Sequence, residues 1–237
     1  LKRMHPYYPP TLSLPHYIEN TYATTYLLSS VFIYFLMVFI PIQILSSTNR
    51  SLTFLGKLSL FWYVLNFLLH LIFEGYYIFN YGKIHENNGF MAQLWKEYSL
   101  ADSRYLIKDG MTFSLELITV IIIAPLCFIN SMFIYCNSIK QYPLTIIIES
   151  FHLFSVSVYF ISAYLENMIY TRPETLYYYV YFWLMNAPWI MIPFLRCCYA
   201  WKFICENLLE LKFIREDIEI QEMNLMENQN IMDVNEE

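Results

Sequence analysis

Five long stretches of apolar sequence constrain this chain more than any other feature. The first lies between Glu19 and Arg50 and contains no charged residue. The others contain few charges and cover residues 58–81, 111–139, 142–164 and 176–195. About 20 helical residues cross a hydrocarbon core about 30 Å thick, and backbone polar groups in lipid must satisfy one another. The sequence therefore predicts an all-α, multi-pass membrane protein that forms a bundle of five transmembrane helices.

The composition excludes several classes of function. The chain is 57% hydrophobic and only 14% charged, whereas soluble domains carry about 25% charged residues. Its net charge of -6 gives no basic surface for nucleic acid. It has no glycine-rich phosphate loop, and its five cysteines form no Cys-x-x-Cys motif. We therefore expect no nucleic-acid partner, no cofactor and no thiol-bound metal.

The chain divides into three parts by composition. Residues 1–22 form an N-terminal segment, residues 23–202 form the membrane domain, and residues 203–237 form an acidic tail that we expect to be disordered at its end. Within the membrane domain, residues 83–109 form a polar connector long enough to indicate a functional loop. Five crossings would divide the 14 Lys and Arg residues equally between the two sides, so charge does not predict the orientation.

His70 and Glu74 are the strongest chemical signal in the sequence. Their spacing of four places both side chains on one face of the second apolar helix. A charge at bilayer depth costs roughly 2.5 to 3.5 kcal/mol, so the carboxylate needs a partner or a cavity. The pair is interpreted as a proton donor and acceptor; the alternative is a packing pair that only fixes the bundle.

Two further pairs lie in apolar stretches. Glu116 and Thr119 share a helix face, where a carboxylate could stabilise a cation or the pair could form an interhelical hydrogen bond. Asn186 and Trp189 also lie three residues apart. The indole face can hold a cation, although taken alone an ordinary core or interfacial tryptophan is the favoured interpretation.

Glu149 and His152 form another pair, three residues apart. Glu149 lies close to the start of the fourth apolar helix, so we expect it to reach the membrane interface and to have a structural role. His70, Glu74 and Glu116 offer three possible metal ligands, but no histidine-rich motif recurs, and no metal site is predicted.

A series of short motifs in a fixed order resembles the emopamil-binding protein family, the sterol delta-8 to delta-7 isomerases with an EXPERA-type membrane domain. The resemblance covers roughly residues 5 to 202. The motifs are His5-Pro-Tyr-Tyr-Pro9, His70-x-x-x-Glu74-Gly75, Gln93-Leu-Trp-Lys-Glu-Tyr98, Asp102-Ser-Arg-Tyr105, Glu116-x-x-Thr119, Ala124-Pro-Leu126 and Tyr181-Phe-x-x-Met-Asn186-Ala-x-Trp189.

The resemblance implies a five-helix bundle in the endoplasmic reticulum membrane, often dimeric, with a sterol pocket that opens to the bilayer. It implies the shift of a ring double bond without a cofactor. The family's functional positions carry over to His70, Glu74, Glu116, Thr119, Asn186 and Trp189, and the resemblance places Asp102 and Tyr105 near the pocket. One departure lies in the fourth helix, where family members usually carry Gly-Gln-x-Tyr-Gly-Asp and this chain reads Phe151-His152-Leu-Phe-Ser155-Val156.

These residues suggest a mechanism. Moving an alkene by one position requires a proton added to one carbon and another removed from its neighbour, through a carbocation. The expected catalytic residues are His70 and Glu74, which transfer the protons in an order left open, and Glu116 and Trp189, which stabilise the cation. The expected substrate-binding residues are Thr119, Asn186, Asp102 and Tyr105. Because a protonated amine resembles the carbocation, lipophilic amines are expected to inhibit.

Two other functions remain open at this point. One is a non-catalytic membrane protein of the same fold that binds sterols or other amphiphiles, which the altered fourth helix favours. The other is a proton-coupled transporter, for which the sequence supplies no inverted repeat and no pair of broken helices.

Overall fold

Every regular element in the described part of the chain is a helix. The computed structural model describes residues 5–235, so residues 1–4 of the predicted N-terminal segment and residues 236–237 of the predicted tail lie outside it. The elements, in chain order, are α1 Thr24–Ser47, α2 Phe54–Leu68, η1 Leu69–Glu74, α3 Gly75–Phe79, η2 Ile84–Glu86, α4 Phe90–Tyr98, η3 Ser103–Leu106, α5 Gly110–Ile118, η4 Thr119–Ile123, α6 Ala124–Tyr135, α7 Gln141–Leu165, η5 Leu176–Leu184 and α8 Pro188–Asn235. The predicted all-α class is confirmed.

Within residues 5–235, four helices are long and apolar enough to cross a membrane. They are α1, the continuous run Phe54–Phe79 (α2, η1 and α3), the run Gly110–Tyr135 (α5, η4 and α6), and α7. Each corresponds to one of the predicted apolar stretches. The second begins four residues earlier than predicted, because Thr53 caps its first turn by accepting a hydrogen bond from the Gly56 amide.

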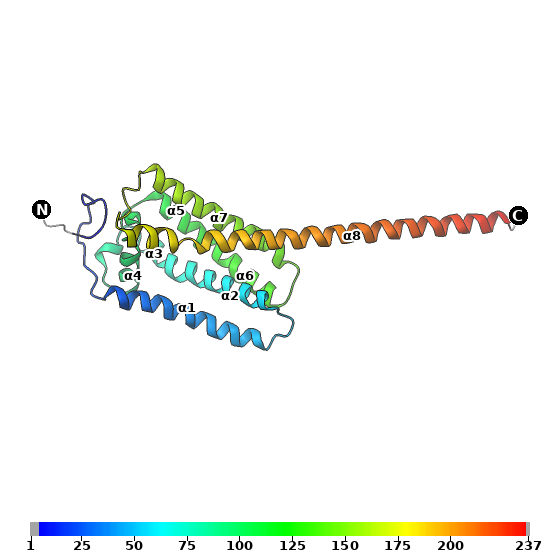
Figure 1. Ribbon diagram of the computed structural model, residues 1–237, viewed down its shortest axis with the longest axis horizontal. Coiled ribbons are helices and arrows are strands. Elements are labelled where there is room, and N and C mark those ends of the chain that lie inside the picture. Colours follow the sequence, from blue (N-terminus) through cyan, green and yellow to red (C-terminus); the bar gives the residue numbers. More distant parts are fainter. Residues whose placement is uncertain (1–4, 236–237) are drawn as a thin grey trace.

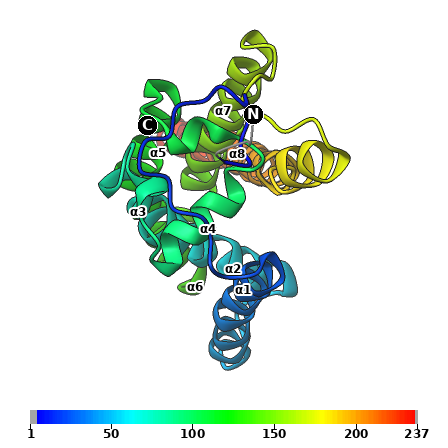
Figure 2. The same cartoon turned by 90° about the vertical axis from the view of Figure 1, so that its left-hand side faces the viewer.

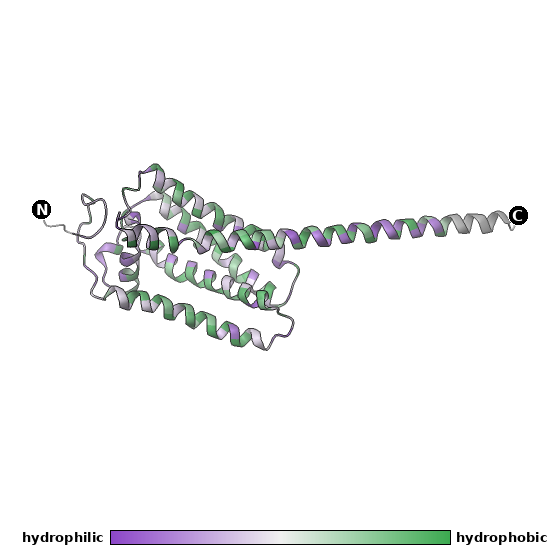
Figure 3. Cartoon of the chain, in the orientation of Figure 1, coloured by the Kyte–Doolittle hydropathy of each residue, from purple (hydrophilic) through white to green (hydrophobic). Residues whose placement is uncertain are grey.

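The helices lie side by side, with their long axes close to the long axis of the molecule (Figure 1). α2 packs on α6, and α7 packs on α8. α1 contacts α2 and α4 but stands at one side of the bundle, as the end-on view in Figure 2 shows. Only 11% of the most apolar 18-residue stretch of α1 is buried, so α1 presents most of its apolar side chains outward. Figure 3 shows apolar residues along the whole length of the long helices of the bundle.

Two of the spans contain a π-helical turn at their centres. These are η1, which carries His70 and Glu74, and η4, which begins at Thr119. η1 and η4 contact each other. A π-turn widens the helix locally, and such turns occur often at functional sites. The apolar pattern predicts uninterrupted α-helices here, because it carries no signal for a π-turn.

The connector of residues 83–109 is folded and covers one end of the bundle. It forms η2, α4 and η3, and Trp95 of α4 stacks on Phe73 with ring centroids 4.3 Å apart. The Trp95 indole nitrogen donates to the Phe73 carbonyl at 2.9 Å. Lys96 is buried beside it and donates to the Ile18 carbonyl at 2.7 Å. These contacts tie the connector to the N-terminal segment and to the second span.

The predicted fifth stretch is divided in the structure. η5 ends at Leu184, a turn covers residues 185–187, and α8 begins at Pro188. α8 continues as a helix to Asn235, through the acidic tail for which the sequence predicted disorder at the end. Its extension projects beyond the bundle (Figure 1). Ion pairs at spacing i, i+4, such as Lys202 with Glu206 at 3.7 Å, support an exposed helix of this kind.

Candidate active site

His70 and Glu74 contact each other directly. The Nδ1 atom of His70 lies 2.7 Å from Oε1 of Glu74, and both side chains are largely buried. The single hydroxyl hydrogen of Thr119 can be donated to the other carboxyl oxygen of Glu74 or to the Glu116 backbone carbonyl, which lies 2.8 Å from the hydroxyl oxygen. The two π-turns thus bring His70 and Glu74 of the second span against the third span.

These side chains open into a cavity of about 590 Å³. Most of the lining is apolar and aromatic, which is typical of sites for small lipophilic molecules. Seven of the eight predicted site residues line it, namely His70, Glu74, Tyr105, Glu116, Thr119, Asn186 and Trp189. They come from five helical elements and from the turn before α8, so the fold brings together side chains up to 119 positions apart in the sequence.

Glu116 lies between Glu74 and the connector. Its Oε1 atom accepts a hydrogen bond from the Tyr105 hydroxyl at 2.8 Å. Burial raises the pKa of Tyr105 well above its ordinary value, so Tyr105 remains a protonated donor. The Glu116 carboxyl also lies beside the Glu74 carboxyl.

Asn186 and Trp189 reach the cavity from the segment that joins η5 to α8. The Asn186 amide donates to the Phe182 carbonyl at 2.7 Å, which orients its oxygen toward the Tyr98 hydroxyl, 3.5 Å away. The Trp189 indole nitrogen donates to Oδ1 of Asn66 at 2.9 Å. The indole is therefore fixed at its edge while the ring lines the cavity.

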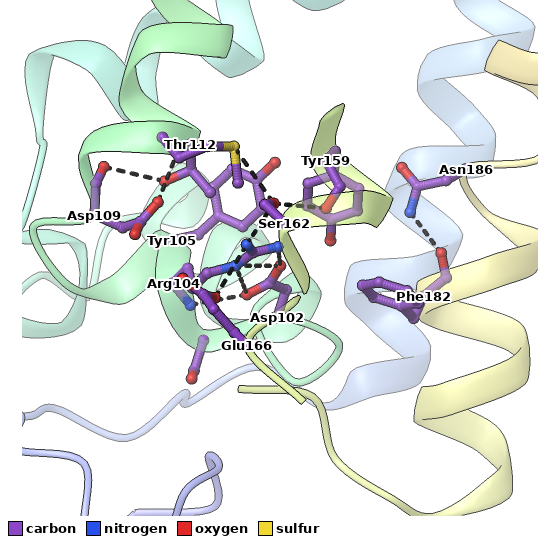
Figure 4. Close-up of polar contacts among 12 residues, drawn as sticks. Asp102, Arg104, Tyr105, Asp109, Thr112, Tyr159, Ser162, Glu166, Phe182 and Asn186 are labelled. Atoms are coloured by element: carbon purple, nitrogen blue, oxygen red, sulfur yellow. Dashed lines mark hydrogen bonds and ion pairs between the residues drawn. The ribbon is translucent and has the colours of Figure 1, made fainter. Parts of the chain in front are cut away.

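Asp102 does not line the cavity. Its carboxylate pairs with Arg104 at 2.6 Å, with both side chains about 1% exposed, and it caps η3 by accepting from the Arg104 amide. Figure 4 shows this cluster, in which Arg104 also reaches Ser162 and Glu166. The geometry fits a role in holding the connector on α7, whereas the family resemblance implies a place for Asp102 near the pocket.

A second polar cluster adjoins the first, and sequence reasoning missed its role. Nε2 of His152 lies 3.1 Å from Nε2 of His70, and Nδ1 of His152 lies 2.9 Å from Oε2 of Glu149. The expectation that Glu149 reaches the interface is wrong, because its side chain is 0% exposed. Glu149 can be buried because its negative charge is compensated inside the bundle. Arg196 of α8 pairs with it at 3.1 Å, and the Trp62 indole donates to the same carboxylate oxygen at 3.1 Å. Only the helix packing reveals these partners.

Among the described residues, no group of three or more His, Cys, Asp or Glu side chains is arranged to hold a metal ion. The acidic and imidazole groups instead form hydrogen bonds with one another. The arrangement can move protons within an apolar, water-poor space and can place negative charge and an aromatic ring beside a transient cation.

Comparison with known proteins agrees with this chemistry. A model of the family EXPERA (EXPanded EBP superfamily) matches residues 90–200. The 3-beta-hydroxysteroid-Delta(8),Delta(7)-isomerase of Cavia porcellus is 30% identical over 198 residues, which cover 80% of this chain and 84% of that protein. A probable 3-beta-hydroxysteroid-Delta(8),Delta(7)-isomerase of Arabidopsis thaliana is 33% identical, covering 85% of this chain and 89% of that protein. A protoglabretal synthase of Citrus sinensis is 28% identical, covering 75% and 85%.

Proposed function

The chain belongs to the EXPERA (EXPanded EBP superfamily) family, and from this membership and the geometry of the cavity we propose that it is a sterol delta-8 to delta-7 isomerase. The observation that carries the proposal is the hydrogen-bonded pair of His70 and Glu74 in an apolar cavity. An alkene is a very weak base, so its protonation requires a donor held close and shielded from water.

The proposed reaction has two proton transfers. The pair of His70 and Glu74 gives a proton to one alkene carbon, which leaves a tertiary carbocation on the ring. A neighbouring carbon then loses a proton to the pair, and the double bond forms one position away. The enzyme ends with the same number of protons, so the reaction needs no co-reactant.

The other cavity residues have supporting roles in this proposal. Glu116 supplies negative charge and Trp189 supplies a ring face to the cation. Thr119 orients Glu74, and Tyr105 orients Glu116, through the hydrogen bonds described above. Asn186 positions the substrate. A lipophilic amine, once protonated, would occupy the place of the cation and inhibit.

The substrate is proposed to enter from the bilayer. An apolar groove of about 460 Å³ lies between α1, the second span and α4. It shares Val31, Phe35, Leu69 and Phe73 with the lining of the active-site cavity. A lipid-soluble sterol in the hydrocarbon region could therefore reach His70 without crossing water.

The membrane arrangement completes the proposal. η5 with the first turns of α8 forms a fifth span, because residues 176–201 carry no charge except that of Arg196, which is paired inside the bundle. From the family resemblance we propose that the protein resides in the endoplasmic reticulum membrane, with its N-terminus in the lumen, and forms a homodimer.

Complementation of an isomerase-null yeast strain tests the function. We expect the wild-type chain to restore delta-7 sterols, and His70→Ala, Glu74→Gln and Glu116→Gln to fail although the proteins accumulate normally by immunoblot. Delta-8 sterols that persist with the wild-type chain would favour a non-catalytic binding protein or a transporter. Near wild-type rescue by all three variants would contradict the assigned site.

A further inference from the structure

A row of hydrogen bonds extends from the acid–base pair to the opposite side of the bundle core. It runs from Glu74 through His70 and His152 to Glu149, with separations of 2.7, 3.1 and 2.9 Å. His70, His152 and Glu149 are each no more than 2% exposed. Each hydrogen bond in the row contains one hydrogen, and a neutral imidazole donates from one nitrogen and accepts at the other. The direction of the hydrogen bond at one end therefore determines the direction of the others.

At the Glu149 end of the row, the positions of the hydrogens are fixed by two groups that can only donate. Oε1 of Glu149 accepts from the Trp62 indole N–H and from Nε–H of Arg196, and neither group can act as an acceptor. The paired guanidinium keeps Glu149 ionised. Its second oxygen, Oε2, therefore accepts from His152, and the His152 hydrogen lies on Nδ1.

The positions of the hydrogens on His70, at the Glu74 end of the row, follow from this assignment. A neutral His152 with its hydrogen on Nδ1 has a lone pair on Nε2. His70 must then carry a hydrogen on its own Nε2 and donate it across the 3.1 Å contact. The remaining nitrogen of His70, Nδ1, faces Glu74 at 2.7 Å and is the atom at which His70 gains and loses a proton.

We propose that His152, anchored by Glu149, is a positioning residue that fixes His70 in the Nε2–H form, so that the movable proton of the active site is shared only between Nδ1 of His70 and the Glu74 carboxylate. The inference rests on the proposed isomerase function. In the charged state His70 carries hydrogens on both nitrogens. When a proton passes to the alkene, Nδ1 is left with its lone pair, and the proton later removed from the neighbouring carbon refills the same bond. The Nε2 hydrogen stays in place throughout.

Three substitutions separate this role from simple packing. In His152→Gln, the amide oxygen can accept from His70 and the NH₂ group can donate to Glu149, so the Nε2–H form is kept. His152→Leu keeps apolar bulk and removes both hydrogen bonds. In Glu149→Gln, Trp62 and Arg196 hold the amide oxygen, so the NH₂ group donates to His152 and every hydrogen in the row is reversed.

The test measures kcat for a delta-8 sterol and the Kd of a lipophilic tertiary amine, on purified full-length protein. We expect kcat to fall by about tenfold or more in His152→Leu and Glu149→Gln, because a histidine in the wrong tautomer loses much of its activity. We expect His152→Gln to keep kcat within about threefold of wild type. The amine Kd, which also reports correct folding, should change by less than about threefold in His152→Leu and His152→Gln.

Three results would overturn the inference while the wild-type chain is active: full kcat in His152→Leu, a loss in His152→Gln as large as in His152→Leu, or a parallel loss of amine affinity and kcat. The last result would leave His152 a packing residue. An inactive wild-type chain that still binds the amine would overturn the isomerase function, and the inference with it.

Discussion

The indole nitrogen of Trp189 donates to Oδ1 of Asn66 at 2.9 Å, across 123 positions of sequence. Asn66 is itself fixed, because its amide donates to the Trp62 carbonyl at 2.8 Å. The bond holds the indole by its edge, while the ring lines the cavity that also contains Glu116. This geometry suits cation–π attraction, since the polar N–H is already satisfied and the ring face remains available.

Trp189→Leu keeps apolar bulk and removes the ring quadrupole. We expect amine affinity to fall by roughly 0.5 to 2 kcal/mol, about two- to thirty-fold, and turnover to fall with it. Binding of a neutral sterol product should change much less. Radioligand displacement measures the affinity. Trp183→Leu is the matched control, because Trp183 stacks on Phe160 outside the cavity. Unchanged amine affinity with lost turnover would leave Trp189 a packing role only.

Tyr105→Phe removes one hydroxyl from the site. The hydroxyl donates to Glu116 at 2.8 Å, and a hydrogen bond to a charged group contributes about 1.5 to 3 kcal/mol. We expect kcat to fall by about tenfold or more while the protein remains folded. Tyr77→Phe is the control, since that hydroxyl bonds to Thr112 away from the cavity. Equal losses in both variants would show that Glu116 does not depend on Tyr105.

Asp102→Asn separates folding from substrate binding. It removes the charge that compensates Arg104, and breaking a buried ion pair costs about 3 to 5 kcal/mol. We expect a large fall in the thermal unfolding temperature, with amine affinity of the remaining folded protein unchanged. Glu174→Gln, in an exposed ion pair with Arg172, should change stability by about 1 kcal/mol or less. A selective loss of ligand affinity in Asp102→Asn would restore the role at the pocket that the resemblance implies.

Lys96 should make stability depend on pH. Burial lowers the pKa of Lys96 to about 8, below its usual value of about 10.4 in an unfolded chain. Between these values only the unfolded chain holds the proton, so the contribution of this group to the free energy of unfolding rises with pH. Wild type should therefore gain stability relative to Lys96→Met from pH 8 to about 9.5. Thermal unfolding at several pH values measures the stability of each variant, and Lys202→Met, at an exposed lysine, is the control. If the stability of wild type and of Lys96→Met changed in parallel with pH, the lowered pKa of Lys96 would be contradicted.

The apolar pattern predicted the helices better than it predicted their contacts. Four predicted spans correspond to helices long enough to cross a membrane, because apolar runs of this length allow little else in lipid. The break after Leu184 and the π-turn that carries His70 were not predicted. Both depend on local hydrogen bonding that hydrophobicity does not encode.

Part of the candidate site could also be predicted from the apolar pattern of the sequence. His70, Glu74 and Glu116 stand out because charge is expensive in an apolar helix. Glu149 was expected at the interface because it lies close to the start of its helix. Nothing in the sequence indicates that it meets Arg196, which lies 47 residues further along the chain. A pairing across helices requires the packing of α7 on α8, which the structure supplies.

Conversion of a delta-8 sterol by the purified wild-type protein in D₂O tests the proposed isomerase function and the role of His70 together. We expect a delta-7 product that carries one solvent-derived deuterium at the newly protonated carbon, without any added cofactor, and no product with His70→Ala. A sterol that is bound and recovered as the unlabelled delta-8 isomer would show that the protein is not an isomerase.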